Sequence, residues 1–151
     1  MSKLLIVYHS QSDRTERLAQ AVYQGALQET GVESRLMRAF DATLQDLLWC
    51  KGLIFGTPEN FGYMSGALKD FFDRTFYPAE PYQLNLPYGV FISAGNDGTG
   101  ALREIDRIAL GYPLRKVADA VIGRGEPGKA DISRCSDLGL ALAAGLNMGI
   151  F

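Results

Sequence analysis

The sequence predicts an α/β fold in which a doubly wound parallel sheet is covered by helices on both faces. Apolar runs typical of strands recur five times, and a helical pattern follows each of them. The first, third and fourth runs are almost continuously apolar, as buried parallel strands are, whereas the second is more polar and suits a sheet edge. The usual strand order of such a sheet is 2-1-3-4-5, and ligands bind above the carboxyl ends of strands 1 and 3.

The elements follow one another without a linker, so one domain covering residues 1–151 is expected. Strands are expected at residues 3–9, 32–38, 52–57, 87–94 and 117–122, and helices at 15–30, 42–50, 66–76, 99–110 and 132–146. Gly31 suits the end of the first helix, and Asp41 is a candidate cap for the second. Two irregular stretches rich in Pro or Gly, 78–86 and 123–131, are expected to be loops.

Four of these helices carry an apolar stripe that fits burial against the sheet. The stripes are Leu18, Ala19, Val22, Ala26 and Leu27 in the first helix; Leu44, Leu47 and Leu48 in the second; Leu68, Phe71 and Phe72 in the third; and Leu138, Leu142 and Leu146 in the fifth.

Composition limits the function classes. Apolar residues make up 47% and charged residues 21%, as in ordinary globular domains. A net charge of −2 and a pI near 5.4 argue against a nucleic-acid surface. No apolar run is long enough to span a bilayer and no signal-peptide pattern is present, so a cytoplasmic location away from membranes is expected. Cys50 and Cys135 are far apart and there is one His, a pattern that supports neither a metal site nor a redox pair.

The first strand runs directly into a turn rich in hydroxyl groups that opens a helix. Ser10, Ser12 and Thr15 lie within six residues. The free N–H groups of a helix's first turn and nearby hydroxyls form a cradle for a phosphate group. The alternative is that Ser12, Asp13 or Thr15 simply caps the helix.

Two further loops follow strands 3 and 4. Residues 56–66 contain three glycines, with Phe61 and Tyr63 between them, and could place aromatic faces and peptide groups around a flat heteroaromatic ring. Residues 93–100 are also glycine-rich and allow close approach of the backbone to a ligand. Each loop alone could be an ordinary connection or a surface turn. Because the loops after strands 1, 3 and 4 converge at one edge of such a sheet, a common pocket is the better explanation.

These motifs resemble the flavodoxin-like family that binds flavin mononucleotide (FMN), especially its short-chain NAD(P)H-dependent flavin or quinone oxidoreductases. The resemblance spans essentially the whole chain. Residues 8–15 are similar to the phosphate loop, and residues 56–66 with the following segment 68–74 are similar to the flavin-ring loop and its helix. The family's usual glycine in the phosphate loop is Asp13 here, which would have to adopt the glycine-like turn. Arg14 could contact the phosphate or lie in solvent.

The resemblance implies FMN as the cofactor. The expected FMN contacts are Ser10, Gln11, Ser12, Asp13, Arg14 and Thr15 for the phosphate, and Thr57, Pro58, Glu59, Asn60, Phe61, Gly62, Tyr63, Ser93, Ala94, Gly95, Asn96, Asp97 and Gly98 for the ring. No catalytic side chain is nominated, because flavin hydride transfer requires none. His9 is expected to be structural, and the carboxylates of Glu59 and Asp97 to be mainly solvated.

The expected function is that of an FMN-binding oxidoreductase in which NAD(P)H reduces a quinone or another small acceptor. One alternative is an electron carrier of the flavodoxin type that docks on redox proteins. Such carriers tend to be strongly acidic, so the modest net charge of −2 favours the enzyme. Another is a flavin-free binding module with the same fold. A response-regulator receiver is disfavoured, because Gly56 and Thr57 stand where an aspartate would end strand 3. Tyr77, Tyr82 and Tyr88 could form a homo-oligomer contact or shield the flavin.

Overall fold

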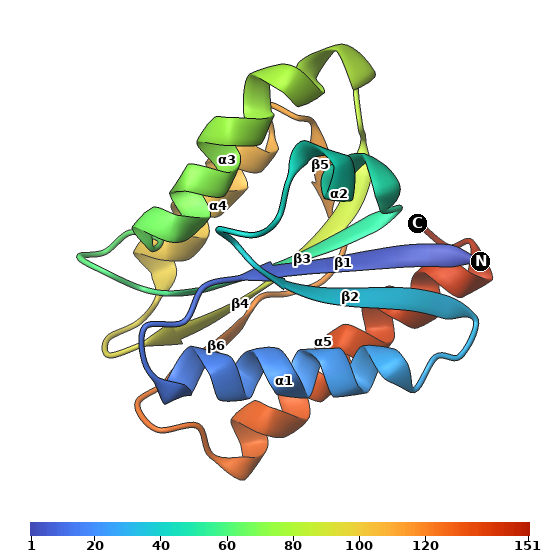
Figure 1. Cartoon of the computed structure of the whole chain (residues 1–151). Coiled ribbons are helices and arrows are strands. Elements are labelled where there is room, and N and C mark those ends of the chain that lie inside the picture. Colours follow the sequence, from blue (N-terminus) through green and yellow to red (C-terminus); the bar gives the residue numbers. More distant parts are fainter.

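Parallel strands form the central sheet of the computed structural model, which describes all of residues 1–151. The strands are β1 (Ser2–Tyr8), β2 (Val32–Arg38), β3 (Gly52–Pro58), β4 (Leu86–Ala94), β5 (Leu114–Lys116) and β6 (Val121–Arg124). The order is β2-β1-β3-β4-β5, and β6 also pairs with β4 (Figure 1). The predicted order of five strand positions is therefore confirmed.

The fifth strand position is the main departure from the predicted elements. One strand was expected at residues 117–122, but β5 and β6 lie separately against the two ends of β4, with Leu86 opposite Leu114 and Ile92 opposite Ile122. The segment between them begins with Val117, whose N–H still donates to Tyr88 of β4, and continues as Ala118-Asp119-Ala120, residue types that are depleted in strands. The ladder is interrupted where the side chains favour it least.

The helices are α1 (Asp13–Leu27), α2 (Leu44–Trp49), α3 (Gly66–Ala79), α4 (Thr99–Ala109) and α5 (Lys129–Met148), with a short 3₁₀ turn at Glu80–Tyr82. Several ends differ from the expected ones. Gln28, in a right-handed conformation, caps α1, so Gly31 does not terminate it. Thr43 and not Asp41 caps α2, because its hydroxyl and the Asp46 carboxylate form a capping box. Helix α3 continues through Pro78, which was expected to begin a loop.

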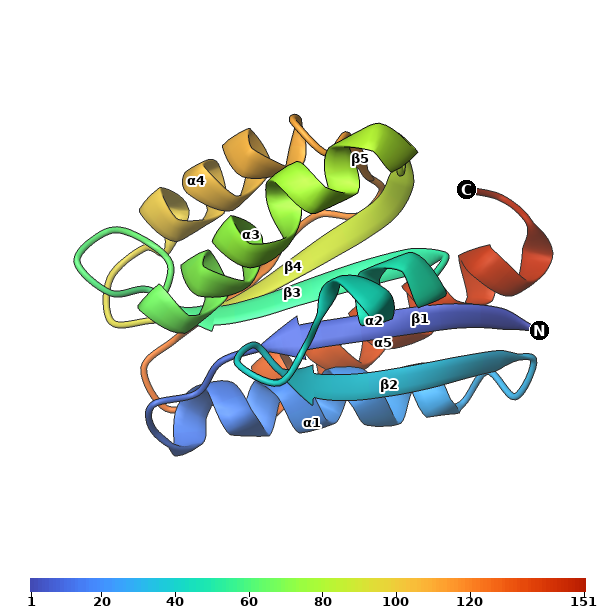
Figure 2. The same ribbon diagram turned by 45° about the horizontal axis from the view of Figure 1, so that its top comes forward.

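The sheet is covered on both faces, as predicted (Figure 2). Helices α1 and α5 pack on one face over a core of 16 buried residues, and α2, α3 and α4 pack on the other over a core of 23. Helices α1 and α5 approach so closely that a Cβ on Gly25 or Gly139 would meet backbone of the other helix at 1.9 Å. Neither glycine could be replaced without separating the two helices.

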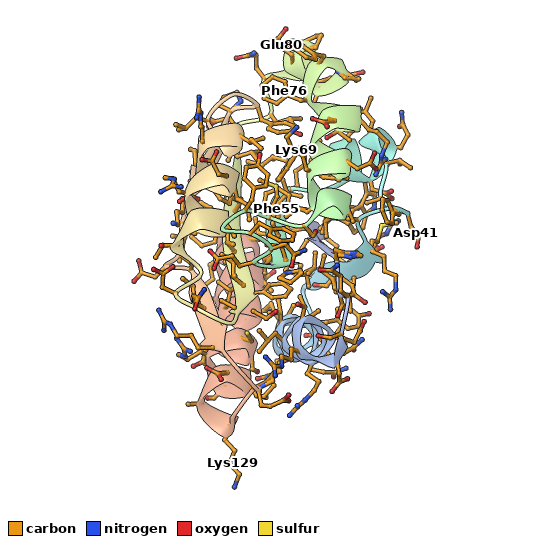
Figure 3. All side chains as sticks on the ribbon, turned by 90° about the vertical axis from the view of Figure 1, so that its left-hand side faces the viewer. Asp41, Phe55, Lys69, Phe76, Glu80 and Lys129 are labelled. Carbon is orange, nitrogen blue, oxygen red and sulfur yellow. The ribbon has the colours of Figure 1, made fainter.

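The larger core is rich in aromatic side chains. Phe55 lies among side chains between the layers (Figure 3), and its ring is 5.1 Å from that of Phe72. Tyr88, considered above as an exposed contact residue, is 3% exposed and donates a 2.7 Å hydrogen bond to Asp106. Tyr88 is the third residue of β4, and its ring packs in the core 6.0 Å from that of Phe55. Tyr77 and Tyr82 are exposed, at 76% and 59%.

This topology gathers three loops at the carboxyl edge of the sheet. Residues 9–12 follow β1, residues 59–65 follow β3 and residues 95–98 follow β4, and Figure 2 shows all three at the same edge. None of the helices has the length and apolarity that a membrane span requires.

Candidate functional site

The loop after β1 is built around the first turn of α1. Ser12 is the N-cap, and its hydroxyl oxygen accepts a hydrogen bond from the N–H of Arg14 at 3.4 Å. The Ser10 hydroxyl accepts from the N–H of Glu16 at 3.1 Å and donates to the Ser12 carbonyl. A serine that accepts one bond still has its own proton to donate, so Ser12 retains a donor at the positive end of α1.

Asp13 differs from the expectation for this loop, and Arg14 pairs with a carboxylate. Asp13 is the first residue of α1, and it is not among the non-glycine residues with positive φ. The expectation that it must adopt a glycine-like turn is therefore wrong, because position 13 already belongs to the helix. Its exposed carboxylate is 3.8 Å from Arg17. The Arg14 guanidinium is 3.0 Å from Glu126, a surface pair that can exchange for another anion at small cost.

Thr15 joins α1 to the end of β4. Its hydroxyl is 2.6 Å from that of Ser93, and the two residues are 1% and 7% exposed. The first turn of α1 is therefore fixed to the sheet beneath the loop. In this arrangement both hydroxyls, expected to contact the phosphate and the ring respectively, bind each other.

A second network, which no local sequence pattern marks, fixes the same turn from the other side. The Tyr8 hydroxyl donates to both carboxylate oxygens of Glu16, at 2.8 and 3.0 Å, and Arg38 lies 3.1 Å from the same carboxylate. Burial, together with the hydrogen bond to Glu16, raises the pKa of Tyr8 to about 12. His9 packs edge-on to Phe40 at 5.9 Å, and burial and the charge of Arg38 lower the pKa of His9.

The loop after β3 is a strained turn with an exposed aromatic tip. Asn60 and Tyr63 exchange backbone hydrogen bonds of 2.8 and 2.9 Å, with Phe61 and Gly62 between them at φ values of 54° and 71°. A left-handed conformation is uncommon for phenylalanine, and the Phe61 side chain is fully exposed. No contact within the chain offsets the backbone strain at Phe61 or the exposure of its apolar ring to water. Such strain is typical of a residue that contacts a ligand.

The base of this turn is held by side chains. The Thr57 hydroxyl accepts from the N–H of Ser65 at 2.9 Å and donates to the Pro58 carbonyl at 2.8 Å. At the other side, the Asn60 amide donates to Gln11 at 2.6 Å and so connects the loops after β3 and β1.

The loop after β4 leads into α4, whose first N–H groups bind carboxylates. Glu59 accepts from the N–H groups of Gly98, Gly100 and Ala101 at 3.2, 3.1 and 3.3 Å. Asp97 accepts from the N–H of Thr99 at 2.9 Å, and this bond is the largest cause of its lowered pKa. The expectation that Glu59 is mainly solvated is wrong, since it is half-buried and bound to another element.

Helices α1 and α4 thus begin at the same edge with opposite caps. Although Asp13 and Glu16 stand in its first turn, the N–H groups of α1 are capped by neutral hydroxyls and Ser12 keeps a free donor. The first N–H groups of α4 are bound by carboxylates. An anion would be favoured at α1. Glycines 62 and 95 have open space where a Cβ would stand, so a ligand can approach the backbone of both ring loops. These residues fit a ligand with an anionic group and a flat ring.

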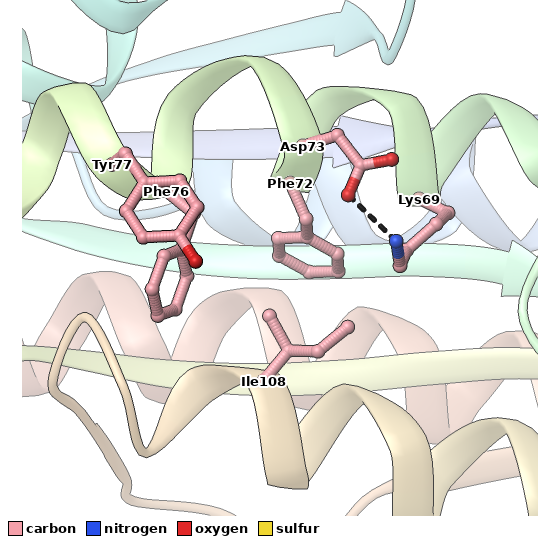
Figure 4. Close-up of a pocket in the computed structure, with 6 residues that line it drawn as sticks. All are labelled: Lys69, Phe72, Asp73, Phe76, Tyr77 and Ile108. Carbon is pink, nitrogen blue, oxygen red and sulfur yellow. Dashed lines mark hydrogen bonds and ion pairs between the residues drawn. The ribbon is translucent and has the colours of Figure 1, made fainter.

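A separate hollow of about 220 Å³ lies between α3 and α4 (Figure 4). It contains none of the predicted site residues, and the Lys69–Asp73 ion pair of 2.6 Å lies at its rim. Its lining residues are Lys69, Phe72, Asp73, Phe76, Tyr77 and Ile108.

The family model for NADPH-dependent FMN reductases matches residues 22–117. The chain belongs to this family. Membership of this family supports a flavin-binding oxidoreductase or flavodoxin-like role.

Curated relatives match part of the chain. A flavodoxin of Aquifex aeolicus is 40% identical over 73 residues, covering 48% of this chain and 40% of that protein. An NAD(P)H dehydrogenase (quinone) of Acidithiobacillus ferrooxidans is 33% identical over 95 residues, covering 50% of this chain and 48% of that protein. The chain thus spans less than half the length of these two relatives.

Solved structures agree in fold over nearly the whole chain. A flavodoxin from the domain Archaea superposes with a TM-score of 0.83 at 21% identity, covering 95% of this chain and 98% of the other. A flavodoxin, WrbA-like protein from Agrobacterium tumefaciens gives 0.78 at 21% identity, with 99% of both chains covered. At this identity the likeness establishes the flavodoxin-like fold.

Proposed function

We propose that this family member binds FMN and uses NAD(P)H to reduce a quinone or another small acceptor. The observation that carries the proposal is the pairing, at one sheet edge, of a hydroxyl-capped helix N-terminus with the strained, exposed Phe61 turn. The first suits a phosphate and the second a planar ring. Family membership and the similarity to an NAD(P)H dehydrogenase (quinone) support the reaction class.

Bound FMN would supply hydride and electron transfer, and the chain would hold and orient it. Ser10, Ser12 and the first N–H groups of α1 would bind the phosphate, and Arg14 would exchange Glu126 for it. Phe61 and Tyr63 would contact the ring, and the peptides of loops 57–63 and 93–98 would bind its polar edge. Asp13, in this proposal, points its carboxylate toward Arg17 and leaves the phosphate to its neighbours.

A carrier that docks on redox proteins is the second candidate, favoured by the 40% identity with the Aquifex aeolicus flavodoxin. The two functions differ in their electron donor. An enzyme of the proposed class reduces its own flavin with NAD(P)H and passes the electrons to a soluble quinone, whereas a carrier requires a reductase protein.

The experiment mixes FMN-loaded protein anaerobically with NADH or NADPH and follows the flavin absorbance, then adds a soluble quinone. The proposal predicts bleaching by the nicotinamide alone and recovery on quinone addition, with protein-free FMN as the control. Bleaching only in the presence of a separate ferredoxin or flavodoxin reductase would contradict the enzyme and favour the carrier.

A further inference from the structure

Glu59 connects the two loops between which the flavin ring is proposed to lie. It stands in the loop after β3, and its backbone N–H continues the sheet by donating to Ser93 of β4 at 2.9 Å. Its carboxylate then crosses to α4 and accepts from Gly98, Gly100 and Ala101. One side chain therefore satisfies three N–H groups that α4 cannot satisfy within itself, since Gly98, the N-cap, has no side chain.

A second contact brings the same two loops together. A Cβ on Gly100 would meet the Gly62 carbonyl oxygen at 2.1 Å, so the tip of the β3 loop lies directly against the first turn of α4. Gly98 has a φ of 76°, which allows the chain to enter α4 at this angle. The separation of the loops thus depends on Glu59 and on the absence of a side chain at position 100.

We propose that Glu59 is a positioning residue for the flavin ring, acting through the α4 N-terminus to fix the spacing of the two ring loops. This inference rests on the proposed function. Charge-assisted hydrogen bonds are among the strongest available, and a preformed gap spares the ordering cost of binding. The same carboxylate neutralises the positive end of α4, so the phosphate has one favourable helix end at this edge, that of α1.

The test compares Glu59→Gln, Glu59→Ala and Gly100→Ala with the wild type, using FMN and riboflavin as probes. Because the effect is on the ring, both ligands lose affinity by the same factor, about tenfold for Glu59→Ala, as expected for loss of a charge-assisted hydrogen bond. Glu59→Gln loses less, because it keeps one acceptor oxygen. Gly100→Ala loses affinity without any change of charge. Asp46→Asn is the matched control: it removes a capping carboxylate from α2, away from the ring loops, and leaves both affinities unchanged.

Amide hydrogen exchange in flavin-free protein gives a readout independent of binding. The N–H groups of Gly98, Gly100 and Ala101 exchange faster in Glu59→Ala than in the wild type, while core amides of β3 and β4 do not change. Unchanged exchange at these three groups, or faster exchange with unchanged affinity for both flavins, overturns the inference. Wild-type protein that binds neither flavin overturns the proposed function, and the inference with it.

Discussion

Helices α1 and α4 begin at the same edge of one sheet, yet different side chains accept hydrogen bonds from their N-terminal N–H groups. Helix α1 is capped by the Ser12 hydroxyl, with Ser10 beside it, and the nearest cation, Arg14, is held only by an exposed Glu126. Helix α4 receives the carboxylates of Glu59 and Asp97. Helix α1 also carries Asp13 and Glu16 in its first turn, but these carboxylates pair with Arg17 and Arg38 and accept from no N–H of the helix end. Because both helix ends have the same dipole, the difference is whether a carboxylate binds their N–H groups. Helix α1 thus keeps the end at which we propose that an external anion binds, whereas at α4 the carboxylate of Glu59 connects two loops.

A carboxylate cap on α1, like the one on α4, should remove the difference between the two helix ends. Ser12→Asp keeps a good N-cap but places a charge where the phosphate is proposed to bind. It should weaken FMN binding by roughly 100- to 1000-fold, because like charges a few ångströms apart near a protein surface repel by about 3 to 4 kcal/mol. Riboflavin binding should not change. Isothermal titration measures both.

Ser12→Asn is the matched control for that variant, since asparagine is an equally good N-cap without the charge. It should lose far less FMN affinity than Ser12→Asp. Equal losses in the two variants would mean that the cap geometry, and not its charge, determines binding.

A second variant measures how much a hydroxyl group of the first turn of α1 contributes to the stability of the fold. Thr15→Val leaves the buried Ser93 hydroxyl without its partner and should lower the free energy of unfolding by about 1 to 3 kcal/mol. Chemical denaturation measures the loss. The double variant Thr15→Val with Ser93→Ala should recover much of it, because both polar groups are gone. If the double variant is no more stable than the single one, the hydrogen bond is not the source of the loss.

A variant at Phe61 tests the proposed contact with the flavin ring. Phe61→Ala should weaken FMN and riboflavin alike by about tenfold, the loss of one aromatic contact of up to about 1.5 kcal/mol. Because the side chain is fully exposed, the melting temperature should not fall. A loss of FMN affinity without a loss of riboflavin affinity would place Phe61 outside the ring contact.

The smallest expected effect is on pH dependence. The pKa of His9 is lowered in the folded chain by burial and by Arg38, so the unfolded chain takes up this proton first. Its contribution to stability is full above the ordinary pKa of about 6.5 and is lost as the pH falls through the lowered pKa of the folded state. The loss between about pH 7 and pH 5 should be less than about 1 kcal/mol, because His9 is partly exposed and screened. His9 is the one histidine of the chain, so the free energy of unfolding of His9→Gln should lack this dependence on pH. An unchanged pH dependence in the variant would mean that another group causes it.

The periodic features of the fold could be predicted from the sequence, and its long-range contacts could not. Strands β1, β3 and β4 are nearly continuous apolar runs, so their burial followed from the residue pattern, and their order followed from the usual order of a doubly wound sheet. The split at Ala118–Ala120 reflects the weak strand propensity of three residues. In the sequence pattern the strand-favouring Val117, Val121 and Ile122 outweigh them and predict one continuous strand.

The candidate site shows the same limit. Ser12 as a cap and the glycine-rich loops have local signatures, and the structure places them at one edge. The partners of Glu59 lie about forty residues further along the chain, and a loop carboxylate ordinarily faces water, so no local signal marks it. The bond between Thr15 and Ser93 is equally distant in sequence.

We propose above all that α1 receives the phosphate of FMN, and titration of flavin-free wild-type protein with FMN and with riboflavin under identical conditions tests this. We expect tight FMN binding with quenched flavin fluorescence, and much weaker binding of riboflavin, which lacks the phosphate. Equal affinity for the two, or no binding of either, would contradict it.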